Sequence, residues 1–234
     1  MASALLFDFG DTLAYLWVPK AERFDWLCRQ SGISLDRSRA RIGAIAFERV
    51  FSEPTESPSL GWRGSLAAFT AGLAGAGVRD APRLAEQLFK TAQGLPSELH
   101  PDPQAHEVLQ SLQAQGRRLG VVSNHVGRLE ANLEELGLRG YFDVALDSGI
   151  LGMRKPDARI FRLACETLRV DPRDALNVGD EPRADVLGAA ATGLGAILID
   201  PLGAYGPGYR SLPCRRVARL GDVPRALAKG SAGA

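Results

Sequence analysis

The chain has 234 residues, of which 45% are hydrophobic and 24% charged, and its 28 Lys and Arg residues nearly match 27 Asp and Glu residues. This is the composition of an ordinary globular protein, and a net charge of +1 argues against a general nucleic-acid binder and an acidic disordered chain. Cys28, Cys165 and Cys214 form no paired motif, which argues against a disulfide framework or a zinc site. With no apolar run of about 18 residues and no signal-peptide pattern, we expect a cytoplasmic protein without a membrane partner.

Five short apolar runs predict buried parallel strands, because each ends in polar residues or glycine. Helical patterns lie between the later runs, and Asp157 is placed to cap one of these helices. This alternation predicts a doubly wound, Rossmann-like α/β fold. The predicted strands are residues 4–9, 119–122, 142–146, 175–178 and 196–199, and the apolar positions of the helices span residues 105–112, 126–136, 160–168 and 186–191.

One interval interrupts the alternation of strands and helices. Residues 15–97 contain all three Trp residues and only helical patterns, at 24–30, 42–51, 62–73 and 84–89, with a loop rich in Pro and Ser at 54–59. We therefore predict a helical domain, residues 15–97, inserted into an α/β core formed by residues 1–14 and 98–234. Beyond residue 201 the sequence predicts an edge strand at 216–219 and a short helix near 223–227.

Polar residues follow the predicted strands at the edge where open α/β sheets bind ligands. Taken singly, each is explained as well by a helix cap, a turn or a solvated charge. Taken together, carboxylates, a hydroxyl, an amide and one of only four Lys residues are suited to hold a divalent cation beside a phosphate. These residues are Asp8, Ser123, Asn124, Lys155, Asp180 and Asp185.

The order of these residues resembles the four motifs of the haloacid dehalogenase-like hydrolase superfamily. The matching stretches are FDFGDTL at 7–13, VVSN at 121–124, GMRKPD at 152–157 and VGDEPRAD at 178–185. The helical insert is similar to the cap domain that members with an early helical cap carry. The resemblance implies a phosphatase that acts on a small phosphorylated molecule.

The resemblance also implies a role for each residue. Asp8 would be the nucleophile that forms an aspartyl intermediate. Mg²⁺ would be held by Asp8, the carbonyl of Gly10 and Asp180, with Asp185 supporting the site from behind. Ser123 and Asn124 would donate hydrogen bonds to phosphoryl oxygens, and Lys155 would neutralise charge between Asp8 and the substrate. Metal and lysine together would offset the repulsion between a carboxylate and a phosphate dianion.

Gly10 departs from the pattern of the phosphatases in this superfamily, which usually carry an acid–base aspartate at that position. Asp11 is no direct replacement, because residues one apart on a strand face opposite ways unless the chain turns sharply, a turn that Gly10 can allow. Loss of acid–base catalysis costs about 10²- to 10⁴-fold in rate.

Four functions stay open at this point. The first is a magnesium-dependent phosphatase that prefers good leaving groups or recruits Asp11 or a cap residue. The second is a metal-independent dehalogenase, although such relatives carry Tyr in place of Gly10. The third is a binding or regulatory protein without turnover, and the fourth is a structural α/β domain.

Substrate choice is expected to reside in the insert. Tyr15, Leu16 and Trp17 either line the site or pack the insert, Arg49 and Arg63 are candidate anion contacts, and His125 is more readily a loop residue than a substrate contact. The substrate and the oligomeric state do not follow from the sequence.

Overall fold

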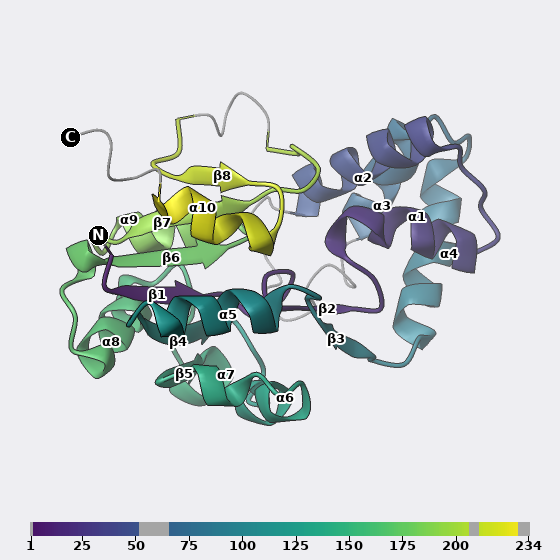
Figure 1. Ribbon diagram of the computed structural model, residues 1–234. Coiled ribbons are helices and arrows are strands. Elements are labelled where there is room, and N and C mark those ends of the chain that lie inside the picture. The colour runs from purple at the N-terminus through teal and green to yellow at the C-terminus, as the bar shows by residue number, and fades with distance from the viewer. Residues whose placement is uncertain (1, 52–65, 206–210, 229–234) are drawn as a thin grey trace. The chain divides into compact units, whose positions relative to one another are not determined.

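The computed structural model in Figure 1 describes residues 2–51, 66–205 and 211–228. The chain divides into two compact units. The core unit comprises Met1–Tyr15, His100–Asp200 and Tyr209–Ala234, and the helical unit comprises Leu16–Leu99 and Pro201–Gly208. The sequence had placed residues 201–208 in the core, but Leu202 and Ala204 are buried in the apolar centre of the helical unit.

The core unit is built on a six-stranded sheet in the order β5-β4-β1-β6-β7-β8. Every pair of neighbouring strands is parallel, and helices flank the sheet (Figure 1). The predicted doubly wound α/β fold is therefore confirmed, including a strand at the edge of the sheet near residue 216. The strands are β1 (Ala4–Phe7), β4 (Arg118–Ser123), β5 (Val144–Asp147), β6 (Ala175–Gly179), β7 (Gly195–Ile199) and β8 (Arg215–Val217).

The strand order reverses around β1, which has β4 on one side and β6 on the other. Phe7 pairs in register with Val121 of β4 and with Val178 of β6. The residues that follow these three positions therefore reach the same end of the sheet, which is where ligands bind in folds of this kind.

The helices of the core unit follow the predicted pattern, with two differences. Asp157 caps α8 as expected, because its side chain accepts a hydrogen bond from the backbone of Arg159. The prediction that Val126 begins a helix was wrong, since α6 starts at Leu129 and Val126 is 77% exposed. The predicted helix near residue 186 begins as a π-helix, Pro182–Leu187, which continues into α9. The α-helices are α5 (Ala105–Ala114), α6 (Leu129–Glu135), α7 (Ser148–Leu151), α8 (Ala158–Leu168), α9 (Gly188–Ala190) and α10 (Val223–Ala228), and the 3-10 turns are Arg139–Tyr141, Pro172–Asp174 and Leu220–Asp222.

The helical unit packs around aromatic side chains. Phe24 lies against Phe47, and Phe47 against Phe69, with ring centroids 6.0 and 5.3 Å apart. Gly43 and Gly72 leave room for the Phe24 ring, where a Cβ would collide with it. The helices are α1 (Lys20–Gln30), α2 (Arg37–Phe51), α3 (Leu66–Gly75) and α4 (Ala81–Gly94). Three predictions lie outside the described residues: the loop at 54–59, the start of the helix at 62–73, and Arg63.

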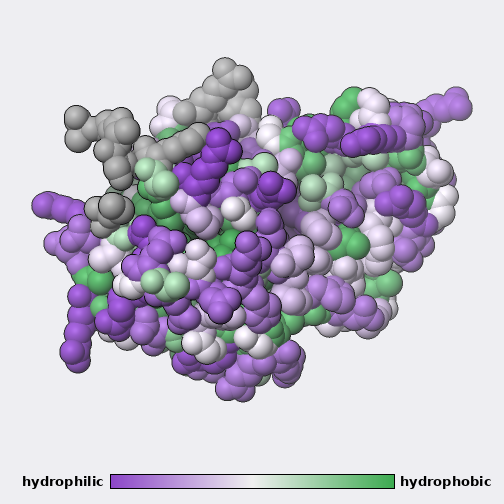
Figure 2. All heavy atoms as spheres, in the orientation of Figure 1, coloured by the Kyte–Doolittle hydropathy of each residue, from purple (hydrophilic) through white to green (hydrophobic). Residues whose placement is uncertain are grey.

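Two short strands, β2 (Ala14–Leu16) and β3 (Leu99–Pro101), pair with each other and had not been predicted, because three residues carry no readable alternation. None of the helices in the described part of the chain is long and apolar enough to cross a membrane. Hydrophilic side chains predominate on the face seen in Figure 2, with hydrophobic ones scattered among them.

Candidate active site

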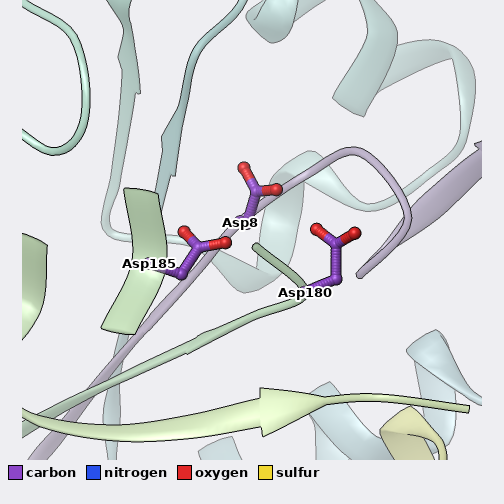
Figure 3. Close-up of side chains that lie close together, drawn as sticks. All are labelled: Asp8, Asp180 and Asp185. Carbon is purple, nitrogen blue, oxygen red and sulfur yellow. The ribbon is translucent and has the colours of Figure 1, made fainter. Parts of the chain in front are cut away.

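Three carboxylates meet at the carboxyl end of the sheet. Asp8 follows β1, Asp180 follows β6, and Asp185 lies in the π-helix (Figure 3). Their oxygens include one from each residue that all lie within 4.8 Å of one another. Asp180 and Asp185 are 7% and 1% exposed. The structure thus brings together three residues that the sequence predicted to share a site.

Lys155 joins this group from the loop before α8. Its Nζ donates to Asp8 Oδ1 at 2.7 Å and to Asp185 Oδ1 at 2.6 Å. The lysine is 3% exposed, so its ammonium is placed by these carboxylates and not by solvent. We call Asp8, Lys155, Asp180 and Asp185 the acidic cluster.

The backbone around β6 holds Asp185 in place. Its Oδ2 accepts a hydrogen bond from the backbone of Glu181 at 3.0 Å, and the amide of Asn177 donates to its carbonyl at 3.2 Å. Gly179 lies so close to the Asp185 carboxylate that a Cβ at this position would overlap it. Asn177 was not singled out from the sequence, although an Asn within an otherwise apolar run is a signal that could have pointed to it.

The acidic cluster carries more negative than positive charge. Three carboxylates and one ammonium sum formally to −2. Burial, together with Asp185 and Asp180, raises the pKa of Asp8 to about 8, although Lys155 opposes the rise. Burial by itself would lower the pKa of Lys155, but the carboxylates of Asp185 and Asp8 outweigh it and raise that pKa. A site of hard oxygen donors with two excess negative charges fits a cation such as Mg²⁺.

Ser123 and Asn124 lie at the end of β4, as predicted. Ser123 is buried. The side chain of Asn124 pairs with the backbone of Lys155, because its Nδ2 donates to the Lys155 carbonyl at 3.0 Å and its Oδ1 accepts from the Lys155 amide at 2.8 Å. Asn124 therefore holds Lys155 in place, a role that the sequence did not indicate. The Asn124 amide has a second N–H besides the one that it donates to Lys155. A hydrogen bond from this second N–H to a phosphoryl oxygen stays a prediction.

The chain turns sharply after Asp8, and the turn lies at Asp11 and not at Gly10. Asp11 adopts a left-handed conformation with φ of 55°, and its backbone N–H donates to the Ala14 carbonyl at 2.7 Å. Gly10 has no such φ, and a Cβ built on it meets no atom within 4 Å. The chain does turn here, as the sequence allowed, but the left-handed residue is Asp11 and not Gly10. Among the described residues, Asp11 is not part of the group of converging carboxylates.

The other candidate contacts have structural partners. Leu16 and Trp17 pack with the apolar centre of the helical unit, and Trp17 Nε1 donates to the Pro96 carbonyl at 2.6 Å. Arg49 donates to the carbonyl of Ala204 at 2.8 Å. Packing and backbone contacts are therefore the roles that the structure assigns to these three residues.

His125 lies in the loop after β4, as the sequence favoured. Its ring lies edge-on to the ring of Phe9 at 5.7 Å, and its Nε2 pairs with the Asn132 side chain at 3.0 Å. Burial lowers the pKa of His125, with Asp147 opposing the shift. Its imidazole is thus directed to neighbours within the core unit.

The parallel sheet with its reversal at β1 and the acidic cluster beyond it define a doubly wound α/β protein with a cluster of carboxylates at the ligand-binding end of its sheet. A family model for haloacid dehalogenase-like hydrolases matches residues 3–193. Haloacid dehalogenase-like hydrolase domain-containing protein 3 of Bos taurus is 33% identical over 206 residues, which cover 83% of this chain and 80% of that protein. The chain belongs to the haloacid dehalogenase-like hydrolases.

Relatives within the family differ in the reaction they are named for. A phosphoserine phosphatase of Thermus thermophilus is 36% identical over 128 residues, which cover 54% of this chain and 50% of that protein. A crystal structure of a 2-haloacid dehalogenase from Pseudomonas syringae is 28% identical, covers 98% of this chain and 100% of its own, and superposes with a TM-score of 0.58. The reaction of this chain must therefore be argued from its own site.

Proposed function

We propose that the protein is a magnesium-dependent phosphatase, which cleaves small phosphorylated molecules through an aspartyl-phosphate intermediate on Asp8. The observation that carries this proposal is the acidic cluster, in which one carboxylate oxygen from each of Asp8, Asp180 and Asp185 lies within 4.8 Å of the others and could bind a divalent cation. A dehalogenase attacks carbon and needs no metal, so this set of hard oxygen donors favours a phosphatase. Phosphatases among the family relatives support the same choice.

Asp8, Asp180 and the carbonyl of Gly10 are the groups that would hold Mg²⁺, with water completing its octahedron. When bound, the ion would neutralise the acidic cluster and stabilise negative charge on the phosphoryl group. Asp185 has another part in this proposal. Because Asp185 accepts hydrogen bonds from Lys155 and from the Glu181 backbone, it orients the lysine. It would stabilise the metal site without binding the ion.

In the proposed reaction, an oxygen of Asp8 forms a bond to phosphorus as the bond to the leaving oxygen breaks. Lys155 holds Asp8 Oδ1 at 2.7 Å, which orients the carboxylate and leaves its other oxygen for attack. Ser123 and Asn124 donate to the phosphoryl oxygens. Water then attacks the phosphorus of the aspartyl phosphate, which releases phosphate and restores Asp8.

Gly10 sets the expected substrate preference. With no carboxylic acid at this position, the leaving oxygen departs without protonation, so aryl phosphates and anhydrides should react faster than alkyl phosphates. Gly10→Asp should reduce this difference. The turn itself places no obstacle to the substitution, because Gly10 has neither a left-handed φ nor a neighbour within 4 Å of its Cβ position.

The helical unit is the part that we assign to substrate selection, since the acidic cluster would contact only the phosphoryl group. In this proposal it serves as the cap over the core site and excludes water during reaction.

The test is hydrolysis of p-nitrophenyl phosphate and of alkyl phosphates by the wild type and by Asp8→Asn, with Mg²⁺ and with EDTA. We expect turnover that requires Mg²⁺, and a loss of about 10⁴-fold or more in the variant, because an amide is not a nucleophile. Halide release from 2-chloropropionate in EDTA would overturn the proposal in favour of a dehalogenase. Binding of Mg²⁺ and phosphate with no turnover of any ester would establish a binding protein instead.

A further inference from the structure

Another buried carboxylate, Asp147, lies outside the acidic cluster and belongs to no motif that the sequence indicated. It ends β5 and pairs in register with Ser123, the last residue of β4. Asp147 is 4% exposed. An isolated carboxylate is costly to bury, so its partners indicate what it does.

Asp147 accepts hydrogen bonds from the backbone of two different segments of the chain, one after β4 and one after β5. Its Oδ1 accepts from Gly127 at 3.0 Å and from Gly149 at 2.8 Å, and its Oδ2 accepts from Leu129 at 3.0 Å. Gly127 and Leu129 belong to the loop after β4 and the start of α6, whereas Gly149 belongs to α7, after β5. One carboxylate therefore joins the segment that follows Ser123 to the segment that leads to Lys155.

Two further contacts join the same segments. The hydroxyl of Ser148 donates to the carbonyl of His125 at 3.1 Å. A Cβ at Gly149 would lie 2.8 Å from the backbone nitrogen of Gly127 and 2.9 Å from the carbonyl oxygen of His125, so the two backbones approach as closely as glycine permits. At the far ends of these segments, the Asn124 side chain pairs with the backbone of Lys155.

We infer that Asp147 is a positioning residue for phosphoryl binding, because it joins the loop carrying Ser123 and Asn124 to the loop carrying Lys155. This inference rests on the proposed function of the acidic cluster. Asp147 touches no reacting atom in this scheme. Both of its oxygens are occupied by backbone donors, so neither loop can shift without breaking a charge-assisted hydrogen bond. The spacing between Ser123 and Lys155 then depends on Asp147.

Asp147→Asn tests this role with almost no change of shape. The amide keeps one acceptor oxygen but sets an N–H₂ group against one of the backbone N–H donors, which pushes the two loops apart. We expect the affinity for inorganic phosphate, measured by calorimetry in the presence of Mg²⁺, to fall about 10- to 100-fold, and kcat/KM for p-nitrophenyl phosphate to fall with it. The affinity for Mg²⁺ alone should stay within about twofold, because Asp8 and Asp180 lie after other strands.

Asp171→Asn is a control for the loss of a helix-capping carboxylate, although Asp171 is exposed and Asp147 is buried. Asp171 also caps a short helical turn of the core unit, by accepting from the backbone of Arg173 at 2.8 Å, but it lies before β6 at the amino end of that strand. Its substitution should leave both affinities unchanged. Gly149→Ala is the second test, because it separates the same two backbones without altering any charge, and it should produce the same selective loss of phosphate affinity.

Each outcome either supports or overturns the role of Asp147 in phosphate binding. Wild-type phosphate affinity in folded Asp147→Asn overturns the inference, as does an equal loss of Mg²⁺ and phosphate affinity, which indicates general loosening. If Asp147→Asn does not fold, Gly149→Ala decides by the same criteria. A wild-type protein that neither binds phosphate nor hydrolyses any ester overturns the proposed function itself, whereas an active wild type with unaffected variants overturns only the role of Asp147.

Discussion

Two buried lysines, one in each unit, stand in contrasting surroundings. In the helical unit, Lys20 pairs with Glu48 at 2.9 Å and donates to the hydroxyl of Tyr205 at 3.2 Å. In the core unit, Lys155 faces both Asp8 and Asp185, with Asp180 close by. Lys20 forms an ion pair with the carboxylate of Glu48, whereas Lys155 forms ion pairs with two carboxylates that lie close to a third, that of Asp180. A paired charge serves packing, and an excess of like charges in a buried site calls for a ligand of opposite charge.

The two lysines also connect different parts of the chain. Tyr205 comes from the segment after Asp200, so the contact of Lys20 joins that segment to α1. Lys155 joins the ends of β1 and β6 through carboxylates. We therefore expect substitutions of Lys20 to change stability and substitutions of Lys155 to change activity.

The largest expected effect is on catalysis. Lys155→Met should reduce kcat/KM for p-nitrophenyl phosphate about 10²- to 10³-fold, because it removes the positive charge held against the nucleophile. Lys20→Met should leave kcat unchanged per mole of folded enzyme. Steady-state kinetics at a temperature where both variants are folded would check this, and equal losses in both would contradict the contrast between the two lysines.

The next effect concerns stability. Lys20→Met removes the ammonium that lies 2.9 Å from the buried Glu48 carboxylate and should lower the free energy of unfolding by about 3–5 kcal/mol. The double variant Lys20→Met, Glu48→Leu should recover part of this loss, because it removes both charges of the pair. Urea unfolding of the two single variants and the double variant measures the coupling. Additive losses would show that the pair contributes no interaction energy.

Magnesium should stabilise the protein through the core site. At a concentration 100 times its dissociation constant, a ligand that binds only the folded state adds about 2.7 kcal/mol, or about 5–10 °C in Tm for a chain of this length. Asp180→Ala should remove most of this shift, and Glu48→Gln in the helical unit should not. Thermal melts over a series of MgCl₂ concentrations would test it, and a wild type that melts at the same temperature in MgCl₂ and EDTA would contradict a metal site.

The last prediction is a pH dependence of the metal-free protein. Because burial and neighbouring carboxylates raise the pKa of Asp8 to about 8, the folded state binds this proton more tightly than the unfolded chain does. The stability from this group is full below the ordinary aspartate pKa of about 4 and decreases as pH rises towards about 8. Since one pKa unit corresponds to about 1.4 kcal/mol, we expect a loss of at least that size.

Urea unfolding in EDTA from pH 5 to pH 8.5 measures this loss. Asp8→Asn should show a much smaller slope, because its side chain does not titrate, and saturating Mg²⁺ should reduce the slope in the wild type. Identical slopes for wild type and Asp8→Asn would show that folding does not raise the pKa of Asp8.

Local patterns were sufficient to predict the sheet and much of the site. The apolar runs give β1, β4, β5, β6 and β7 within a few residues, and the cap at Asp157 follows from its position before a helical pattern. Because parallel strands bring their carboxyl ends to one edge, polar residues after the strands could be expected to meet there. Asp8, Asp180 and Asp185 do so.

Other features depend on contacts between residues far apart in the chain. The residues that end strands and begin helices follow from local sequence, because period, capping and chain direction act over a few residues. Folding was needed to reveal that Asn124 holds the backbone of Lys155, that Asp147 joins two loops, and that Leu202 packs into the helical unit. Each of these depends on strand register and packing, which place groups from distant parts of the chain within hydrogen-bonding or van der Waals distance and leave no repeating signal in the sequence.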